Sequence, residues 1–170
     1  VKLMTLKGNI FNNNFILKKK YKNLVNDINK FNNVTKQLVK LNHKKKYKIA
    51  AFQTRNIPHI GHQKIIEFLL DKFDRVIINP VLGPKKKNDI KNDVLRESWQ
   101  FLINNVYGEK LKFWPIIANM FYGGPREAIH HAILRQNIGF KNFLIGRDHA
   151  GAENIYKKNE AGKLIEKNKD

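Results

Sequence analysis

The chain of 170 residues has the size of one domain, and 42% of its residues are hydrophobic, enough for a real core. It contains no cysteine, which excludes disulfides, thiolate zinc sites and cysteine nucleophiles. No apolar run is long enough to span a membrane, and the first residues lack the basic-then-apolar layout of a signal peptide. We therefore expect a cytoplasmic protein with no membrane partner.

The net charge is +19, from 33 basic and 14 acidic residues. Such a balance attracts anions, including nucleotides, phosphate and sulfate. Lysine and asparagine dominate, as is typical of genomes rich in A and T, so the few arginines are more informative. Three of them, Arg55, Arg126 and Arg147, fall in segments that indicate chemistry. A nucleic-acid binder would need aromatic residues interleaved with basic ones on one face, which we do not find, so we do not expect a nucleic-acid partner.

Hydrophobic periodicity predicts the elements in chain order. Residues 21–41 have helical spacing and predict an N-terminal amphipathic helix. Short apolar strands then alternate with helices. The predicted strands are residues 47–52, 75–82, 111–117 and 142–145, and the predicted helices are residues 59–73, 93–106 and 125–138. This alternation predicts an α/β fold, a Rossmann-like doubly wound parallel sheet with strand order 3-2-1-4. The stretch 154–170 is polar, and we expect it to be frayed.

The loop after the first predicted strand reads QTRNIPHIGH over residues 53–62. In a doubly wound sheet, ligands bind beyond the carboxyl ends of the strands. His59 and His62 share a face at the start of the following helix, where free N–H groups and the helix dipole favour a phosphate, and Gly61 lets an anion approach the backbone. The alternative is a pair of histidines that only cap the helix. The residues Gln53–Asn56 directly upstream disfavour this alternative. A zinc site would need a third ligand that the spacing does not offer.

Three other loops carry polar residues. Residues 146–151 (GRDHAG) enclose Arg147 for phosphate oxygens and Asp148 for a hydroxyl or an amine, although a tight turn with a local ion pair has the same pattern. Residues 122–128 form a glycine hinge before a helix, and residues 85–87 form a lysine run; for both, a plain structural role is equally favoured. His130 and His131 are interpreted as packing or solvated helix positions. The motifs of P-loop kinases and dinucleotide-binding proteins are absent from the sequence.

Three blocks in order, QTRNIPHIGH at 53–62, GGPREAIHHAILRQNIG at 123–139 and GRDHAG at 146–151, resemble the ATP sulfurylase (sulfate adenylyltransferase) family. The similarity covers about residues 45–156. The residues from His59 to His62 spell the HIGH signature, which the wider nucleotidyltransferase superfamily shares with class I aminoacyl-tRNA synthetases. The lysine-serine signature of a synthetase is missing from the sequence.

The resemblance implies a transfer of the adenylyl group of ATP to sulfate, giving adenosine 5′-phosphosulfate and pyrophosphate by in-line attack on the α-phosphorus. It implies Mg²⁺ bound with ATP and no metal held by the protein. The implied catalytic residues are Thr54, Arg55, Asn56, His59 and His62. The implied ATP-binding residues are Gln53, Thr54, Arg55, Asn56, His59, His62, Gly146, Arg147, Asp148 and His149. The implied sulfate contacts are Gln53, Arg55 and the Ala150 backbone, with Lys86 and Arg126 as further phosphate contacts.

The chain also departs from the family pattern. Phe121 stands where the family has an arginine, and Leu95 and Glu97 fall in a stretch that is arginine-rich in the family. The family's N-terminal domain is at best a remnant here, and the family continues past the equivalent of Asp170. We therefore expect a truncated or divergent form.

On this basis the chain divides into an N-terminal segment (1–44), a nucleotidyltransferase catalytic domain (45–156) and a polar tail (157–170). A homo-oligomer is left open. Two alternatives to a sulfate adenylyltransferase also stay open: a nucleotidyltransferase acting on another anionic acceptor, and a non-catalytic module that binds nucleotides or anions.

Overall fold

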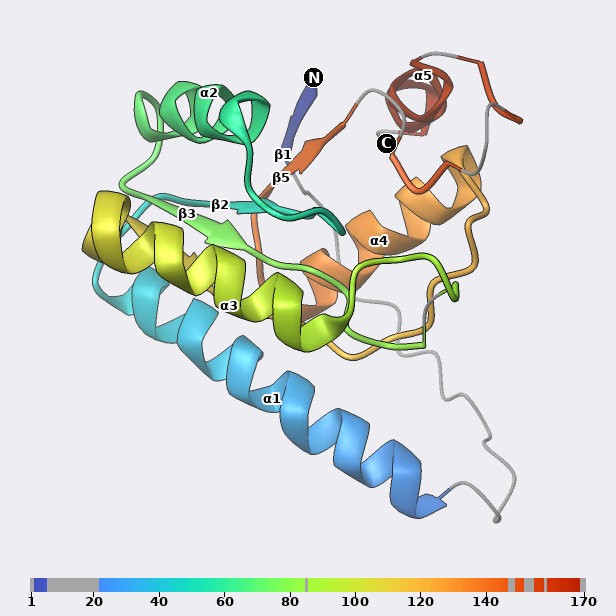
Figure 1. Cartoon of the computed structure of the whole chain (residues 1–170), viewed down its shortest axis with the longest axis horizontal. Helices are drawn as coiled ribbons and strands as arrows, with labels where there is room; N and C mark the ends of the chain where they lie inside the picture. Colours follow the sequence, from blue (N-terminus) through green and yellow to red (C-terminus); the bar gives the residue numbers. More distant parts are fainter. Residues whose placement is uncertain are drawn as a thin grey trace.

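The computed structural model describes residues 2–5, 22–84, 86–146, 149–151, 155–157 and 159–168. Its centre is a five-stranded sheet with the order β1-β5-β2-β3-β4 (Figure 1). The strands are β1 (Lys2–Thr5), β2 (Ile49–Phe52), β3 (Arg75–Ile78), β4 (Leu111–Phe113) and β5 (Asn142–Ile145). The helices are α1 (Lys22–Lys44), α2 (Ile60–Leu70), α3 (Asn92–Leu102), α4 (Pro125–Ile138) and α5 (Glu160–Lys167), with a π-helical turn η2 (Ile103–Tyr107) and a 3₁₀ turn η3 (Gly108–Lys110) between α3 and β4.

Four of the strands are parallel and lie in the predicted order. In the register of β2 with β3, Ala50 lies opposite Val76, and in that of β2 with β5, Phe52 lies opposite Leu144. Strand β2 is buried along its whole length, as is usual where helices cover both faces of a parallel sheet. The predicted α/β fold and the strand order 3-2-1-4 are therefore confirmed. The sheet also gains an antiparallel edge strand, β1, for which the sequence gives no periodic signal.

Two hydrophobic clusters fill the space on the two faces of the sheet. On one face, Val39 of α1 and Ala128 of α4 pack with alternate residues of β2 and β5. On the other face, Ile66 of α2 and Trp99 of α3 pack with the intervening strand residues. The fold is thus a three-layer α/β/α arrangement, in which the long helix α1 and helix α4 share one side of the sheet (Figure 1).

Helix boundaries follow local chemistry closely at α4. Pro125 occupies the first helical position, and Gly139, with a φ of 110°, ends the helix in the left-handed conformation that favours glycine. Helix α3 stops four residues earlier than predicted, because the backbone widens into the π-helical turn η2. None of the described helices combines the length and the apolarity needed to cross a membrane.

The C-terminal region corrects one expectation. Residues 160–167 are not frayed but form helix α5, which packs against α4. Two of its apolar residues, Ala161 and Ile165, are buried in the core cluster that α1 and α4 share, and Leu164 is half-buried. The polar composition of this stretch hid a short amphipathic face, because only these three apolar residues carry it.

Candidate active site

A cavity of about 440 Å³ lies where the loops after β2 and β5 meet. These two strands are neighbours in the sheet, so the loops at their carboxyl ends face each other, as expected for a ligand site in a doubly wound fold. The residues that line the cavity are Phe52, Gln53, Thr54, Arg55, Asn56, His59, Gly61, His62, Ile65, Met120, Gly146, His149 and Ala150. Every implied residue of the first loop is among them.

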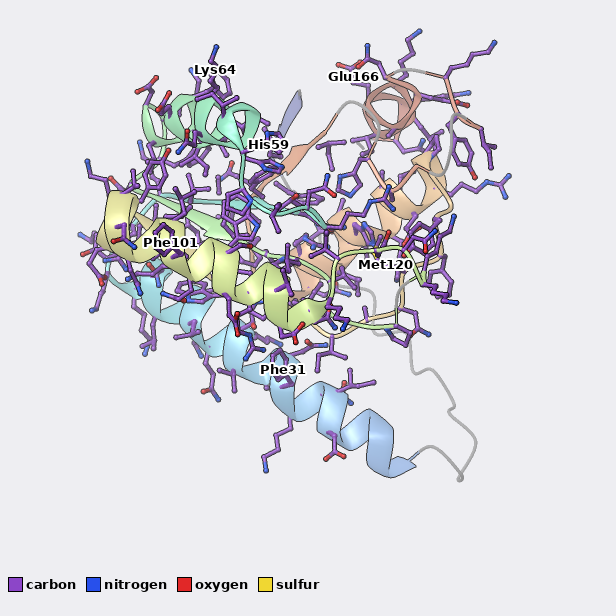
Figure 2. The ribbon with its side chains drawn as sticks, viewed as in Figure 1. Phe31, His59, Lys64, Phe101, Met120 and Glu166 are labelled. Carbon is purple, nitrogen blue, oxygen red and sulfur yellow. The ribbon has the colours of Figure 1, made fainter. Side chains whose placement is uncertain are left out.

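His59 is the N-cap residue of α2, and Figure 2 shows it at the start of that helix. Its Nδ1 accepts a hydrogen bond of 3.1 Å from the backbone N–H of Gly61. A ring whose Nδ1 is an acceptor carries its proton on Nε2, and that N–H is a donor available to an anion. The capping role and the anion-binding role of His59 are thus compatible, because each uses a different ring nitrogen.

His62 is buried beneath His59. The two rings lie 3.8 Å apart between centroids, and the His62 ring also packs against Phe52 and Trp99. The hydroxyl of Thr54 lies 3.2 Å from Nε2 of His62. Burial, followed by the positive charge that His59 can carry, lowers the pKa of His62 to about 4, so this ring is neutral at physiological pH.

Arg55 connects the two loops of the cavity. Its Nη2 donates a 3.3 Å hydrogen bond to the carbonyl oxygen of Gly151, which follows β5. Its guanidinium carbon also lies 5.4 Å from the centroid of the Tyr122 ring. Asn56 is fixed from the other side, since its carbonyl oxygen accepts a 3.0 Å hydrogen bond from Nε1 of Trp99. The loop after β2 is therefore held through two adjacent residues, which contact the loop after β5 and helix α3.

Tyr122 connects the loop that contains Lys86 to the same region. Its hydroxyl donates to Asp89 at 2.5 Å and accepts from the backbone N–H of Lys86 at 2.9 Å. The ammonium nitrogen of Lys86 lies 4.5 Å from the Tyr122 ring centroid. Arg55 and Lys86 thus both contact Tyr122, although Lys86 does not line the cavity. Arg126 is exposed on α4 and does not line it either.

The loop after β5 contributes Gly146, His149 and Ala150 to the cavity. The carbonyl oxygen of Ala150 accepts a 3.0 Å hydrogen bond from the N–H of Gly124, which ties this loop to the start of α4. Arg147 and Asp148 lie outside the described residues, and their roles stay predictions. Within the described parts of the chain, no group of three or more histidine, aspartate and glutamate side chains could hold a metal ion.

Comparison with known proteins decides the family. The ATP-sulfurylase family model matches residues 29–170. The chain belongs to the ATP-sulfurylase family. Among curated relatives, the sulfate adenylyltransferase of Hyperthermus butylicus is 46% identical over 118 residues, which are 69% of this chain and 30% of the relative. That of Pyrococcus abyssi is 44% identical over 119 residues, and that of Persephonella marina 44% over 120 residues, each covering 31% of the relative. The chain therefore spans less than a third of the length of these relatives.

Three residues of this ATP-sulfurylase chain for which no site role was expected lie on one face of α4. They are Glu127, His131 and Arg135, spaced four apart and all buried. His131 was expected to be a packing or solvated position, but its Nδ1 lies 3.1 Å from Nε2 of Gln53 and 3.0 Å from Nε2 of His149. The i, i+4, i+8 spacing of three ionisable residues on a helix with apolar neighbours was the available signal.

Proposed function

We propose that this chain carries the catalytic centre of a sulfate adenylyltransferase, which converts ATP and sulfate to adenosine 5′-phosphosulfate and pyrophosphate. The observation that carries the proposal is the hydrogen bond from Arg55 to the carbonyl of Gly151, which joins the two family loops around one cavity. Membership of the ATP-sulfurylase family supports it, as do relatives that bear the name sulfate adenylyltransferase.

The proposed reaction needs positioning and charge neutralisation more than proton transfer. A sulfate oxygen attacks the α-phosphorus, and the bond from that phosphorus to the oxygen bridging the α- and β-phosphates breaks. Sulfate is already deprotonated, so no general base is required. Two anions that repel each other must be held in line, which calls for donors and cations fixed in advance. The cavity offers such groups in Gln53, Arg55 and His59.

We assign the phosphate end of ATP to the start of α2. There the Nε2–H of His59 lies at the positive end of the helix dipole. Lys86, whose ammonium nitrogen lies 4.5 Å from the centroid of the Tyr122 ring, is proposed as a further phosphate contact. Arg126 would need to approach from the surface of α4. Sulfate is assigned to Gln53, Arg55 and the backbone of Ala150.

Mg²⁺ is proposed to enter with ATP. The described residues that line the cavity supply hydroxyl, amide, guanidinium and imidazole groups but no carboxylate, the ligand that Mg²⁺ usually takes from a protein. These residues fit a metal held by phosphate oxygens and water better than one held by side chains. In that arrangement the ion would neutralise charge on the phosphates, and the chain's own residues would bind and orient the phosphate oxygens around it.

The test is exchange of labelled pyrophosphate into ATP, measured with and without sulfate. Sulfate-dependent exchange that disappears in Arg55→Ala is the expected result. Exchange that depends on a different oxyanion would replace sulfate as the acceptor. Tight ATP binding with no exchange under any oxyanion would instead identify a non-catalytic nucleotide-binding module. The matched control is Arg96→Ala, which removes an exposed arginine of α3 outside the cavity.

A further inference from the structure

A buried chain of hydrogen-bonding side chains lies behind the cavity and reaches it through two residues. Glu127 contacts Nε2 of His131 at 3.2 Å, and Nδ1 of His131 contacts both Gln53 and His149. Glu127 and His131 do not line the cavity, whereas Gln53 and His149 do. The contacts of His131 with side chains that line the cavity are therefore those with Gln53 and His149.

The protons in this series of buried side chains can be assigned by starting from its charged end, Glu127. The carboxylate of Glu127 also accepts hydrogen bonds from the backbone N–H groups of Phe121 at 2.8 Å and Gly123 at 2.7 Å. Burial raises the pKa of this carboxyl, but the close contact with Nε2 of His131 and the hydrogen bonds from these two N–H groups outweigh it, and the pKa lies below its usual value. Glu127 is thus an ionised acceptor, and the His131 nitrogen that faces it must carry a proton.

His131 is neutral for two reasons. Its ring is fully buried, which lowers its pKa more than the hydrogen bond to Glu127 raises it. The cation of Arg135, whose Nη1 donates to the carbonyl oxygen of His131, lowers that pKa further. A neutral ring with its proton on Nε2 has a bare Nδ1, which only accepts hydrogen bonds.

The direction of the remaining hydrogen bonds follows. Because Nδ1 of His131 is an acceptor, the NH₂ group of Gln53 and the Nε2–H of His149 share its single lone pair as donors. The oxygen of the Gln53 amide is buried and has no hydrogen-bond partner among the described residues. Without His131, no described acceptor would hold the NH₂ group of this amide in its present position.

We propose that His131 is a positioning residue of the acceptor-anion subsite, because its bare Nδ1 fixes the orientation of the Gln53 amide and the Nε2 tautomer of His149, two side chains that line the cavity. This inference rests on the proposed function insofar as sulfate is the anion. It concerns a residue that touches no ligand itself and acts through two that line the cavity.

The direct test is a histidine ¹⁵N NMR spectrum of the chain at neutral pH, which reports the tautomer of each ring. Neutral His131 and His149, both protonated on Nε2, are expected. A protonated His131, or one that carries its proton on Nδ1, would overturn the proposal, since Gln53 would then not be required to donate. This measurement needs no activity and no bound ligand.

Two variants of His131 test its effect on binding. The side-chain oxygen of His131→Asn can replace Nδ1 as an acceptor, whereas His131→Leu removes the acceptor. Calorimetric titration should show sulfate binding weakened about tenfold in His131→Leu and by no more than about threefold in His131→Asn, with ATP binding little changed in both. His130→Asn is the matched control, because its neighbouring ring on α4 is half-buried and contacts neither Gln53 nor His149 in the described structure.

The outcomes separate this proposal from the proposed function. Sulfate binding that is equal in the wild type and in both His131 variants would overturn the positioning role and leave the function intact. A wild type that binds no sulfate would overturn both sulfate as the acceptor and the subsite that depends on it. Loss of binding in His131→Leu with recovery in His131→Asn would support the positioning role, since a merely structural role would not depend on an acceptor at this point.

Discussion

The hydroxyl of Thr54 and Nε2 of His62 lie 3.2 Å apart and join the loop after β2 to the first turn of α2. The same hydroxyl oxygen accepts a 3.1 Å hydrogen bond from the N–H of Asn56, so its own proton can go to the neutral ring of His62. His62 is thereby tied to the loop through one ring nitrogen. The exposed ring of His59 has an Nε2–H donor free for a phosphate, and the phosphate-binding role of His62, which also lines the cavity, stays a prediction.

His59 can be tested for its two roles separately. His59→Ala removes both the cap on Gly61 and the Nε2–H donor, whereas His59→Asn keeps a side chain that can cap the helix. We expect both variants to lower the rate of adenylyl transfer about 100-fold or more. Only His59→Ala should also lose about 1 kcal/mol of stability in urea denaturation. A wild-type rate in His59→Asn would refute the phosphate-binding role.

The low pKa of His62 predicts that the folded chain loses stability under mildly acidic conditions. Its pKa is about 4 in the folded chain against 6.5 for an ordinary histidine, so between these values the unfolded state binds a proton that the folded state does not. The free energy of unfolding therefore decreases as the pH is lowered through this window, and His131 and His149, whose pKa values are lowered chiefly by burial, add to the same trend.

The measurement for this prediction is urea denaturation of the wild type and of His62→Gln at a series of pH values between about 7 and 5. Glutamine does not titrate, and its side-chain oxygen can take the place of Nε2 beside Thr54. The variant should lose less stability than the wild type over this range. Equal slopes for the two proteins would show that His62 ionises alike in the folded and unfolded states.

Arg55→Lys should not be a conservative change. The guanidinium of Arg55 reaches the carbonyl oxygen of Gly151 and packs over Tyr122, and its planar fork can meet two oxygens of a tetrahedral dianion at once. We expect sulfate affinity to fall about tenfold or more in calorimetric titrations, with a smaller change in ATP affinity. Arg96→Lys on α3 serves as the matched control. Unchanged sulfate affinity in Arg55→Lys would argue against the assigned contact.

The two glycines before α4 provide a matched pair. Gly124 has a φ of 56°, and a Cβ atom there would lie 2.4 Å from the ring of Tyr156; at Gly123 the nearest atom, in Glu127, is 3.6 Å away. Gly124→Ala should cost about 1–3 kcal/mol, because it combines backbone strain with a clash that Tyr156 must relieve by moving. Gly123→Ala should cost clearly less. Thermal or urea denaturation of both variants compares them directly, and equal stabilities would contradict the structure of this turn.

The Gly124 variant has a second expected effect. The N–H of Gly124 donates to the carbonyl oxygen of Ala150, which lines the cavity. Movement of this backbone should therefore weaken sulfate binding in Gly124→Ala but not in Gly123→Ala. A destabilised Gly124→Ala that binds sulfate normally would show that the contact with Ala150 does not shape the anion subsite.

Much of the fold was predictable from local pattern. The alternation of apolar strands and amphipathic helices gave the parallel sheet and its order, and Pro125 with Gly139 marked both ends of α4. The predicted strand order makes β2 and β5 neighbours, and the loops at their carboxyl ends both contribute to the cavity. The edge strand β1 and helix α5 escaped prediction, since a single short strand or three apolar residues give too weak a periodicity.

The sequence by itself determined the family of this chain, because the order and spacing of three blocks identify it without reference to distance. Only the tertiary structure decided how those residues divide the work. Burial makes His62 a neutral structural partner of Thr54, while the same imidazole at His59 stays exposed. His131, which shares its face of α4 with Glu127 and Arg135, becomes a partner of Gln53 because α4 packs this face behind the cavity. Burial and hydrogen-bond direction depend on residues that are distant in the chain, and no local pattern encodes them.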